Sequence, residues 1–262
     1  MNNKIRIFIG SEPKTLIAQK VLEFSLLEQL KGKREIEFCD LSSDDNWTTH
    51  TKEGVHAVLG TGFSLLRWDI PRRCNYKGYA IYLDADILAL GDVGRLWQAD
   101  VDYPNEDASI WCTYQPSKWF KKPTPETSVM FIDCAKAKAN QQTMEHMIDW
   151  FNKYGDPERK EYIRYMRCLN HHIPPQQIPT NWNHLNERHE DTKLLHYTKE
   201  PEQPWVNPDH PHRKIWEKWL VKAIKVNYID KKIISKALKA FRPYSRSVRG
   251  EGLHSHYKYL LQ

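Results

Sequence analysis

The sequence has few cysteines, and their arrangement excludes two common uses of the residue. The five are odd in number and widely spaced, and no two form a C-x-x-C pair. Neither a disulfide framework nor a zinc site is therefore indicated. Reduced thiols are typical of the cytosol, so we expect a cytoplasmic protein whose free thiols are Cys39, Cys74, Cys112, Cys134 and Cys168.

Long hydrophobic runs are also missing. No stretch approaches the roughly 18 apolar residues that a membrane span needs, and the first residues lack the pattern of a signal peptide. The chain has no internal repeat and no low-complexity tract. Its 262 residues, 40% hydrophobic and 27% charged, suit a soluble protein of one domain, or of one domain plus an appendage.

Acidic residues are scarce near the end of the sequence. Residues 213–249 hold twelve Lys or Arg against two acidic residues, so the net charge of +6 comes from this segment. Trp216, Trp219 and Phe241 lie there at helical spacing with aliphatic residues. Such a segment suits an anionic membrane surface. It equally suits a helix pair that packs on the rest of the protein with a solvated lysine face.

Short apolar runs alternate with amphipathic segments before that point. Residues 5–9, closed by turn residues, are typical of a buried parallel strand. With a helix over 16–30 and a strand over 36–41 they predict a β-α-β unit and a largely parallel sheet. Further strands are expected at 80–83, 110–114, 128–132 and 193–196, a polar helix over 140–170, and two helices within 216–241 that break near 227–230.

The tripeptide Asp84-Ala85-Asp86 follows the most strand-like segment of the chain. In open α/β sheets, ligands bind beyond the carboxyl ends of the strands. Two carboxylates there are costly unless a cation neutralises them, and oxygen ligands favour Mn²⁺ or Mg²⁺. The alternative is a solvated turn in which the aspartates cap backbone amides.

Several motifs in the right order resemble retaining glycosyltransferases of the glycogenin type, more specifically a bacterial branch of family 8. They extend over about residues 4 to 205 and include Arg67-Trp68, the run from Tyr76 to Asp86, Ser128-Val-Met, Trp182-Asn183, His196-Tyr-Thr and Pro204-Trp205. The resemblance implies an α/β, nucleotide-sugar-binding GT-A-type (Rossmann-like) mixed sheet with helices on both faces. It implies a catalytic domain over residues 1–210, and residues 211–262 are then a basic helical C-terminal extension.

The resemblance also implies that Asp84, Asp86 and a late histidine bind the metal ion. That histidine is His196, which ends an apolar strand. Imidazole is acceptable to Mn²⁺ although less typical than oxygen. Without the resemblance, a lone histidine at a strand end would be read as structural.

Donor contacts follow from the same resemblance. Arg67 lies seventeen residues before Asp84, and a guanidinium suits a diphosphate or a pair of sugar hydroxyls. Relatives hold the uracil and ribose at the end of the first strand, where Gly10 would allow close approach of the backbone. The expected donor-binding residues are Ile9, Gly10, Ser11, Arg67, Asp84, Ala85 and Lys199.

Two departures from the family are visible. Relatives have H-x-x-G-x-x-K-P-W, whose lysine holds the diphosphate, whereas here Gln203 precedes the proline and the segment is one residue longer. Lys199 is the candidate to replace that lysine. For the sugar's reactive face, Glu126, Asn170 and Asp156 are candidates, and the residues do not choose among them.

We therefore expect a metal-dependent retaining transferase that moves a hexose from a UDP-sugar to a glycan or lipid-linked acceptor, at most peripherally attached to the inner face of a membrane. A sugar-1-phosphate nucleotidyltransferase would need a Gly-rich phosphate loop after the first strand, which is missing here. A nucleic-acid-binding protein would use residues 213–249, but no nucleic-acid motif accompanies the charge. An inactive transferase fold that only binds glycans is the remaining alternative.

Overall fold

The computed structural model describes residues 4–30, 34–39, 41, 65–117, 120–154, 164, 166–169, 172–199, 202–207 and 209–241. The chain divides into two compact units. The first comprises Met1–Gly10, Arg34–Asp84 and Gly94–Trp182, and the second comprises Ser11–Lys33, Ala85–Val93 and Asn183–Gln262. Compact units need not be domains that fold alone, so the expected boundary near residue 210 stays a prediction.

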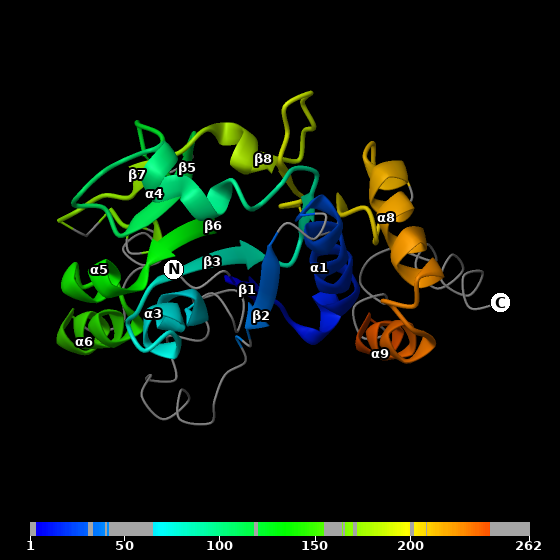
Figure 1. The fold of residues 1–262 in the computed structure, drawn as a ribbon, viewed down its shortest axis with the longest axis horizontal. Coiled ribbons are helices and arrows are strands. Elements are labelled where there is room, and N and C mark those ends of the chain that lie inside the picture. The colour runs from blue at the N-terminus through cyan, green and yellow to red at the C-terminus, as the bar shows by residue number, and fades with distance from the viewer. Residues whose placement is uncertain are drawn as a thin grey trace. The chain divides into compact units, whose positions relative to one another are not determined.

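The first unit is built on a six-stranded mixed sheet (Figure 1). β1 pairs in parallel with β2 and β3, and β5 with β7, whereas β6 is antiparallel to β3 and β5. The order is β2-β1-β3-β6-β5-β7, with β1 Lys4–Gly10, β2 Glu35–Cys39, β3 Tyr79–Asp84, β5 Ile110–Gln115, β6 Thr124–Asp133 and β7 Gln176–Gln177.

The sheet is thus less parallel than the β-α-β pattern predicts. Only eight residues join β5 to β6, whereas a parallel neighbour needs a crossover of about a dozen residues or more. The chain therefore turns back and β6 runs against β5. The mixed α/β class and the strands predicted at residues 5–9, 80–83, 110–114 and 128–132 are confirmed.

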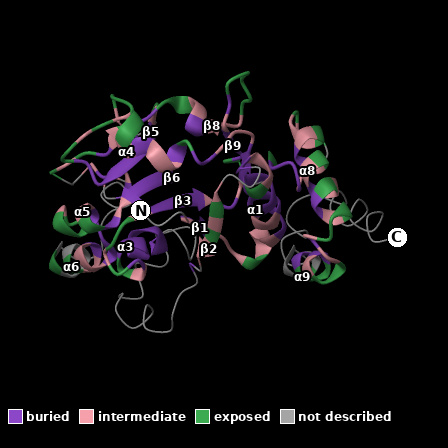
Figure 2. Cartoon of the chain, in the orientation of Figure 1, coloured by how far each residue is buried: buried purple, intermediate pink, exposed green. Residues whose placement is uncertain are grey.

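Helices cover both faces of this sheet. One face packs on α3 (Ile70–Arg73), α5 (Cys134–Ala139) and α6 (Met144–Tyr154), with buried Tyr82 and Met130 in the shared core. On the other face Trp97, in the 3-10 helix Leu96–Gln98 before α4 (Ala99–Asp102), lies edge-on to Phe131 at 5.9 Å. The central strands β1, β3, β6 and β5 are largely buried, whereas the edge strand β2 is not (Figure 2).

The second unit joins a small sheet to three helices. Its strands are β4 (Ile87–Ala89), β9 (Leu194–His196) and β8 (His184–Leu185), in the order β4-β9-β8. Helix α1 (Leu16–Leu30) packs against β4, α8 (Arg213–Lys225) and α9 (Lys231–Phe241). Within this unit Trp216 is only 2% exposed and stacks at a tilt on Trp205, with ring centroids 5.4 Å apart.

Two helix predictions have different outcomes. The two helices between residues 216 and 241 are confirmed, with the break at residues 226–230. The helix over 140–170 is wrong at its start, because Asn140 ends α5 and Gln141 has a left-handed φ of 57°. Helix α6 begins only at Met144, and much of 155–171 lies outside the described residues.

None of the described helices combines the length and the apolar character that crossing a membrane requires.

Candidate functional site

The Asp84-Ala85-Asp86 tripeptide lies where β3 ends and β4 begins. In the first unit, Gly10 pairs in register with Asp84, so the carboxyl ends of β1 and β3 lie side by side. Both strands are buried up to this edge. The aspartates therefore stand at the sheet edge where ligands of open α/β sheets bind.

Asp84 is held by donors from the first unit. The Tyr82 hydroxyl donates to Asp84 Oδ1, and Arg67 Nη2 lies 3.4 Å from the same oxygen. Arg67 is 8% exposed, its Nη1 donates to the Thr127 carbonyl at 2.8 Å, and its guanidinium lies 4.7 Å from the Tyr82 ring centroid. A cation thus offsets part of the Asp84 charge.

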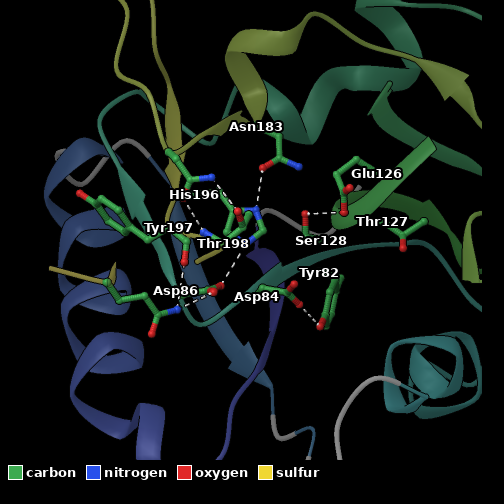
Figure 3. A network of polar contacts seen from close by, with 12 residues as sticks. Tyr82, Asp84, Asp86, Glu126, Thr127, Ser128, Asn183, His196, Tyr197 and Thr198 are labelled. Atoms are coloured by element: carbon green, nitrogen blue, oxygen red, sulfur yellow. Dashed lines mark hydrogen bonds and ion pairs between the residues drawn. The ribbon is translucent and has the colours of Figure 1, made fainter. Parts of the chain in front are cut away.

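Asp86 is held by residues of the second unit. In the β4–β9 pairing, Ile87 lies opposite His196, which brings the imidazole Nε2 to 3.1 Å from Asp86 Oδ1 (Figure 3). Gln203 Nε2 donates to Asp86 Oδ2 at 3.1 Å, and the Tyr197 amide donates to the Asp86 carbonyl at 2.9 Å. Asp86 therefore has an imidazole on one oxygen and a neutral donor on the other.

Asn183 determines the tautomer of His196, and with it whether the nitrogen that faces Asp86 carries a proton. His196 Nδ1 lies 3.1 Å from Asn183 Oδ1, and His196 and Asn183 are 3% and 0% exposed. An amide oxygen only accepts, so the proton of a neutral imidazole lies on Nδ1 and the lone pair on Nε2. A lone pair facing a carboxylate is unfavourable unless the ring is protonated or a cation lies between them.

The donor set fits a divalent cation. Within the second unit, His196 Nε2 lies 3.1 Å from Asp86 Oδ1, and Asp84 ends the strand that comes directly before this pair. Carboxylate oxygens suit Mg²⁺ and Mn²⁺, and Mn²⁺ also accepts imidazole nitrogen. Only Ala85 separates the two aspartates, so the chain itself keeps their carboxylates close.

The remaining expected donor contacts are placed as follows. Ile9 is 7% exposed and Ala85 3% exposed. The Ser11 hydroxyl lies 3.1 Å from that of Thr15. Lys199 has a 61% exposed side chain, 3.3 Å from Glu202. Their roles toward a donor stay predictions.

Among the candidates for the reactive face, the structure describes only Glu126. Its side chain is 15% exposed, lies on β6, forms an ion pair with Arg167 and accepts from the Ser128 hydroxyl at 3.2 Å. Asn170 and Asp156 lie outside the described residues.

Sequence reasoning missed three side chains that support the site. Tyr82 could have been found, because residues two apart in a strand point to the same face as Asp84. Asn183 and Gln203 were noted only as parts of motifs. Their contacts depend on β9 and the segment after it, and no spacing in the sequence indicates them.

Comparisons with known proteins give the fold and leave the family open. No protein-family model matches the sequence, and no curated protein matches it. Among solved structures, a galactosyltransferase LgtC in complex with donor and acceptor sugar analogs has a TM-score of 0.59 at 13% identity, covering 83% of this chain and 96% of that one.

Two other glycosyltransferases have similar scores. GlyE from Streptococcus pneumoniae TIGR4 has a TM-score of 0.59 at 15% identity over 94% of this chain, and the bifunctional WbbM has 0.57 at 10% over 84%. The alignment spans 64% of GlyE and 50% of WbbM. At these identities the likeness shows the fold alone, and this fold is similar to that of GT-A-type glycosyltransferases.

Proposed function

We propose that this chain is a metal-dependent glycosyltransferase that moves a hexose from a UDP-sugar to a glycan or lipid-linked acceptor. One observation carries the proposal: the carboxylate of Asp86 faces the imidazole of His196 at 3.1 Å, directly after a buried strand that ends in a second carboxylate, Asp84. The GT-A-type fold supports it, because such folds hold a nucleotide at that edge of the sheet.

The proposed chemistry needs charge compensation at the departing nucleoside diphosphate. A bound divalent cation would supply it as a Lewis acid. The chain offers ligands for such a cation: Asp84 and Asp86 have carboxylate oxygens, and Asn183 keeps the Nε2 lone pair of His196 turned toward Asp86. Arg67 is the proposed cation for the donor, next to Asp84.

The sugar would then lie beyond the diphosphate. Glu126 is the described acidic side chain proposed for its reactive face, and Arg167 and Ser128 fix its orientation. Retention of the anomeric configuration rests on the family resemblance and is part of the proposal.

A panel of nucleotide sugars tests this function. Incubation with Mn²⁺ should give hydrolysis of at least one UDP-hexose without an acceptor, and EDTA should stop it. Proton NMR of the first sugar released should show the anomeric configuration of the donor. Absence of Mn²⁺-dependent turnover for every donor in the panel, with protein shown to be folded, would contradict the proposal.

We further propose that the enzyme works at the inner, anionic face of a membrane. Because Trp216 is buried, this rests on charge more than on apolar insertion. Among the described side chains of α8 and α9, the exposed charged residues are all lysines: Lys214, Lys218, Lys222, Lys225, Lys231, Lys232, Lys236 and Lys239. Each lysine near an anionic surface contributes about 1 kcal/mol to the free energy of membrane binding.

Vesicle co-sedimentation of the full chain tests that location. The protein should pellet with anionic vesicles at low salt and stay in solution with neutral ones. Replacing Lys218, Lys225, Lys232 and Lys236 by serine should weaken pelleting strongly. Replacing four lysines of the first unit (Lys77, Lys121, Lys136 and Lys153) should not. Equal pelleting of both variants would contradict the proposed surface.

A further inference from the structure

Gln203 uses its side-chain nitrogen twice beside the candidate metal centre. The residue is 5% exposed, and Nε2 donates to Asp86 Oδ2 at 3.1 Å and to the Tyr197 carbonyl at 2.9 Å. A carboxamide nitrogen carries two hydrogens, so these two bonds occupy both. The amide group is therefore fixed in one orientation.

This arrangement ties Asp86 to the strand that bears His196 by two routes. The Tyr197 amide donates to the Asp86 carbonyl at 2.9 Å, and Gln203 bridges the Asp86 carboxylate to the Tyr197 carbonyl. With Oδ2 held by Gln203, the other oxygen, Oδ1, is the one that faces His196 Nε2 at 3.1 Å. Rotation of the carboxylate would break the bond to Gln203.

The effect of this hydrogen bond on Asp86 depends on whether its donor, Gln203, carries a charge. A cationic donor bonded to Asp86 would offset part of the negative charge that attracts a metal ion. A carboxamide is neutral, so it orients the carboxylate and leaves that charge in place. Partners of this kind keep a ligand in its binding orientation, and their loss typically lowers metal affinity about 10- to 100-fold.

We propose that Gln203 is a positioning residue for metal binding, which holds Asp86 with Oδ1 turned toward His196. This rests on the metal centre of the proposed function. It assigns Gln203 a role toward the cation through Asp86, without contact between Gln203 and the sugar donor.

The test measures Mn²⁺ binding to the full chain without nucleotide, from the free Mn²⁺ signal in electron paramagnetic resonance. Gln203→Met keeps the volume and removes both bonds, and should lower Mn²⁺ affinity about 10- to 100-fold. The matched control is Gln19→Met. Gln19 Nε2 also donates to a carboxylate, Glu23 Oε1 at 2.9 Å on α1, and its loss should leave Mn²⁺ affinity unchanged.

A second variant separates positioning from a purely structural role. Gln203→Leu also removes both bonds, and at a temperature where the variant is folded its Mn²⁺ affinity should fall as in Gln203→Met, which a role in stability alone would not produce. It also decides the matter if Gln203→Met does not fold. Unchanged Mn²⁺ affinity in either variant, shown to be folded, overturns the positioning role alone, whereas a wild type that binds no Mn²⁺ overturns the metal centre as well.

Discussion

The two aspartates of one tripeptide lie in opposite electrostatic surroundings. Asp84 has a cation, Arg67, at 3.4 Å and a phenol hydroxyl on the same oxygen. Asp86 has a neutral amide and an imidazole. Arg67 therefore offsets part of the negative charge of Asp84, whereas the negative charge of Asp86 remains available to a metal ion. Asp86 should therefore be the stronger metal ligand.

The largest expected effect comes from Asp86→Ala. We expect Mn²⁺-dependent UDP binding to fall below detection by calorimetry in a protein that still folds. The loss should exceed the roughly 10- to 100-fold cost of removing a residue that only supports a ligand. Asp84→Ala should cost less, because Arg67 already offsets that carboxylate. Equal losses in the two variants would break the comparison.

His196→Ala should have the next largest effect. It removes one ligand but leaves both carboxylates, so metal affinity should fall by roughly tenfold or more, which corresponds to about 1.4 kcal/mol. Asn183→Ala should cause part of the same loss, because the imidazole then loses the acceptor for its Nδ1 proton. Titration of Mn²⁺ into both variants measures this, and unchanged affinity in His196→Ala would remove the histidine from the metal shell.

Arg67→Met should change stability more than it changes metal affinity. It leaves the buried Thr127 carbonyl without its 2.8 Å donor, which costs about 1–3 kcal/mol in the free energy of unfolding. The control is Arg95→Met, whose 64% exposed side chain pairs with Asp102 at 3.2 Å and contributes about 0–1 kcal/mol. Urea unfolding should separate the two; the same midpoint for both would contradict the buried role of Arg67.

The smallest expected effect is a pH dependence of the second unit. Burial lowers the pKa of His184, His210 and His212, and for each a neighbouring cation or histidine adds to the effect. The unfolded chain then binds protons more readily, so stability is present above about pH 6.5 and is lost as pH falls below it.

Melting temperatures at pH 8 and pH 5.5 measure this dependence. The melting temperature should be lower at pH 5.5, and His184→Gln should make the difference smaller, because one of the titrating groups is gone. A larger difference in melting temperature in His184→Gln would contradict the prediction that protonation of His184 destabilises the fold.

The place of the two aspartates could be predicted from the sequence, but the side chains that surround them could not. Asp84 and Asp86 follow a short continuous run of apolar residues that is typical of a buried strand, so their place at the sheet edge was predictable. The order of the family's motifs pointed to His196, whereas a histidine at a strand end does not indicate a ligand by itself. The partners that orient these side chains could not be predicted, because Gln203 reaches Asp86 across 117 positions of the chain and its bond depends on tertiary structure.

The helices of residues 213–241 were predictable from the sequence, but the burial of Trp216 was not. The amphipathic period of residues 213–241 predicts two helices, and they are there. Whether an apolar stripe meets a membrane or a protein core depends on what else is nearby, which the period does not contain. In the structure Trp205, Tyr197 and α1 supply that core for Trp216.

The most direct measurement is anomalous X-ray diffraction at the manganese edge from crystals grown with Mn²⁺ and UDP. We predict one strong anomalous peak within about 2.0–2.4 Å of an oxygen of Asp84, an oxygen of Asp86 and Nε2 of His196, bridged to the UDP phosphates. A UDP molecule bound elsewhere, or a manganese peak that none of these three side chains touches, would contradict the account.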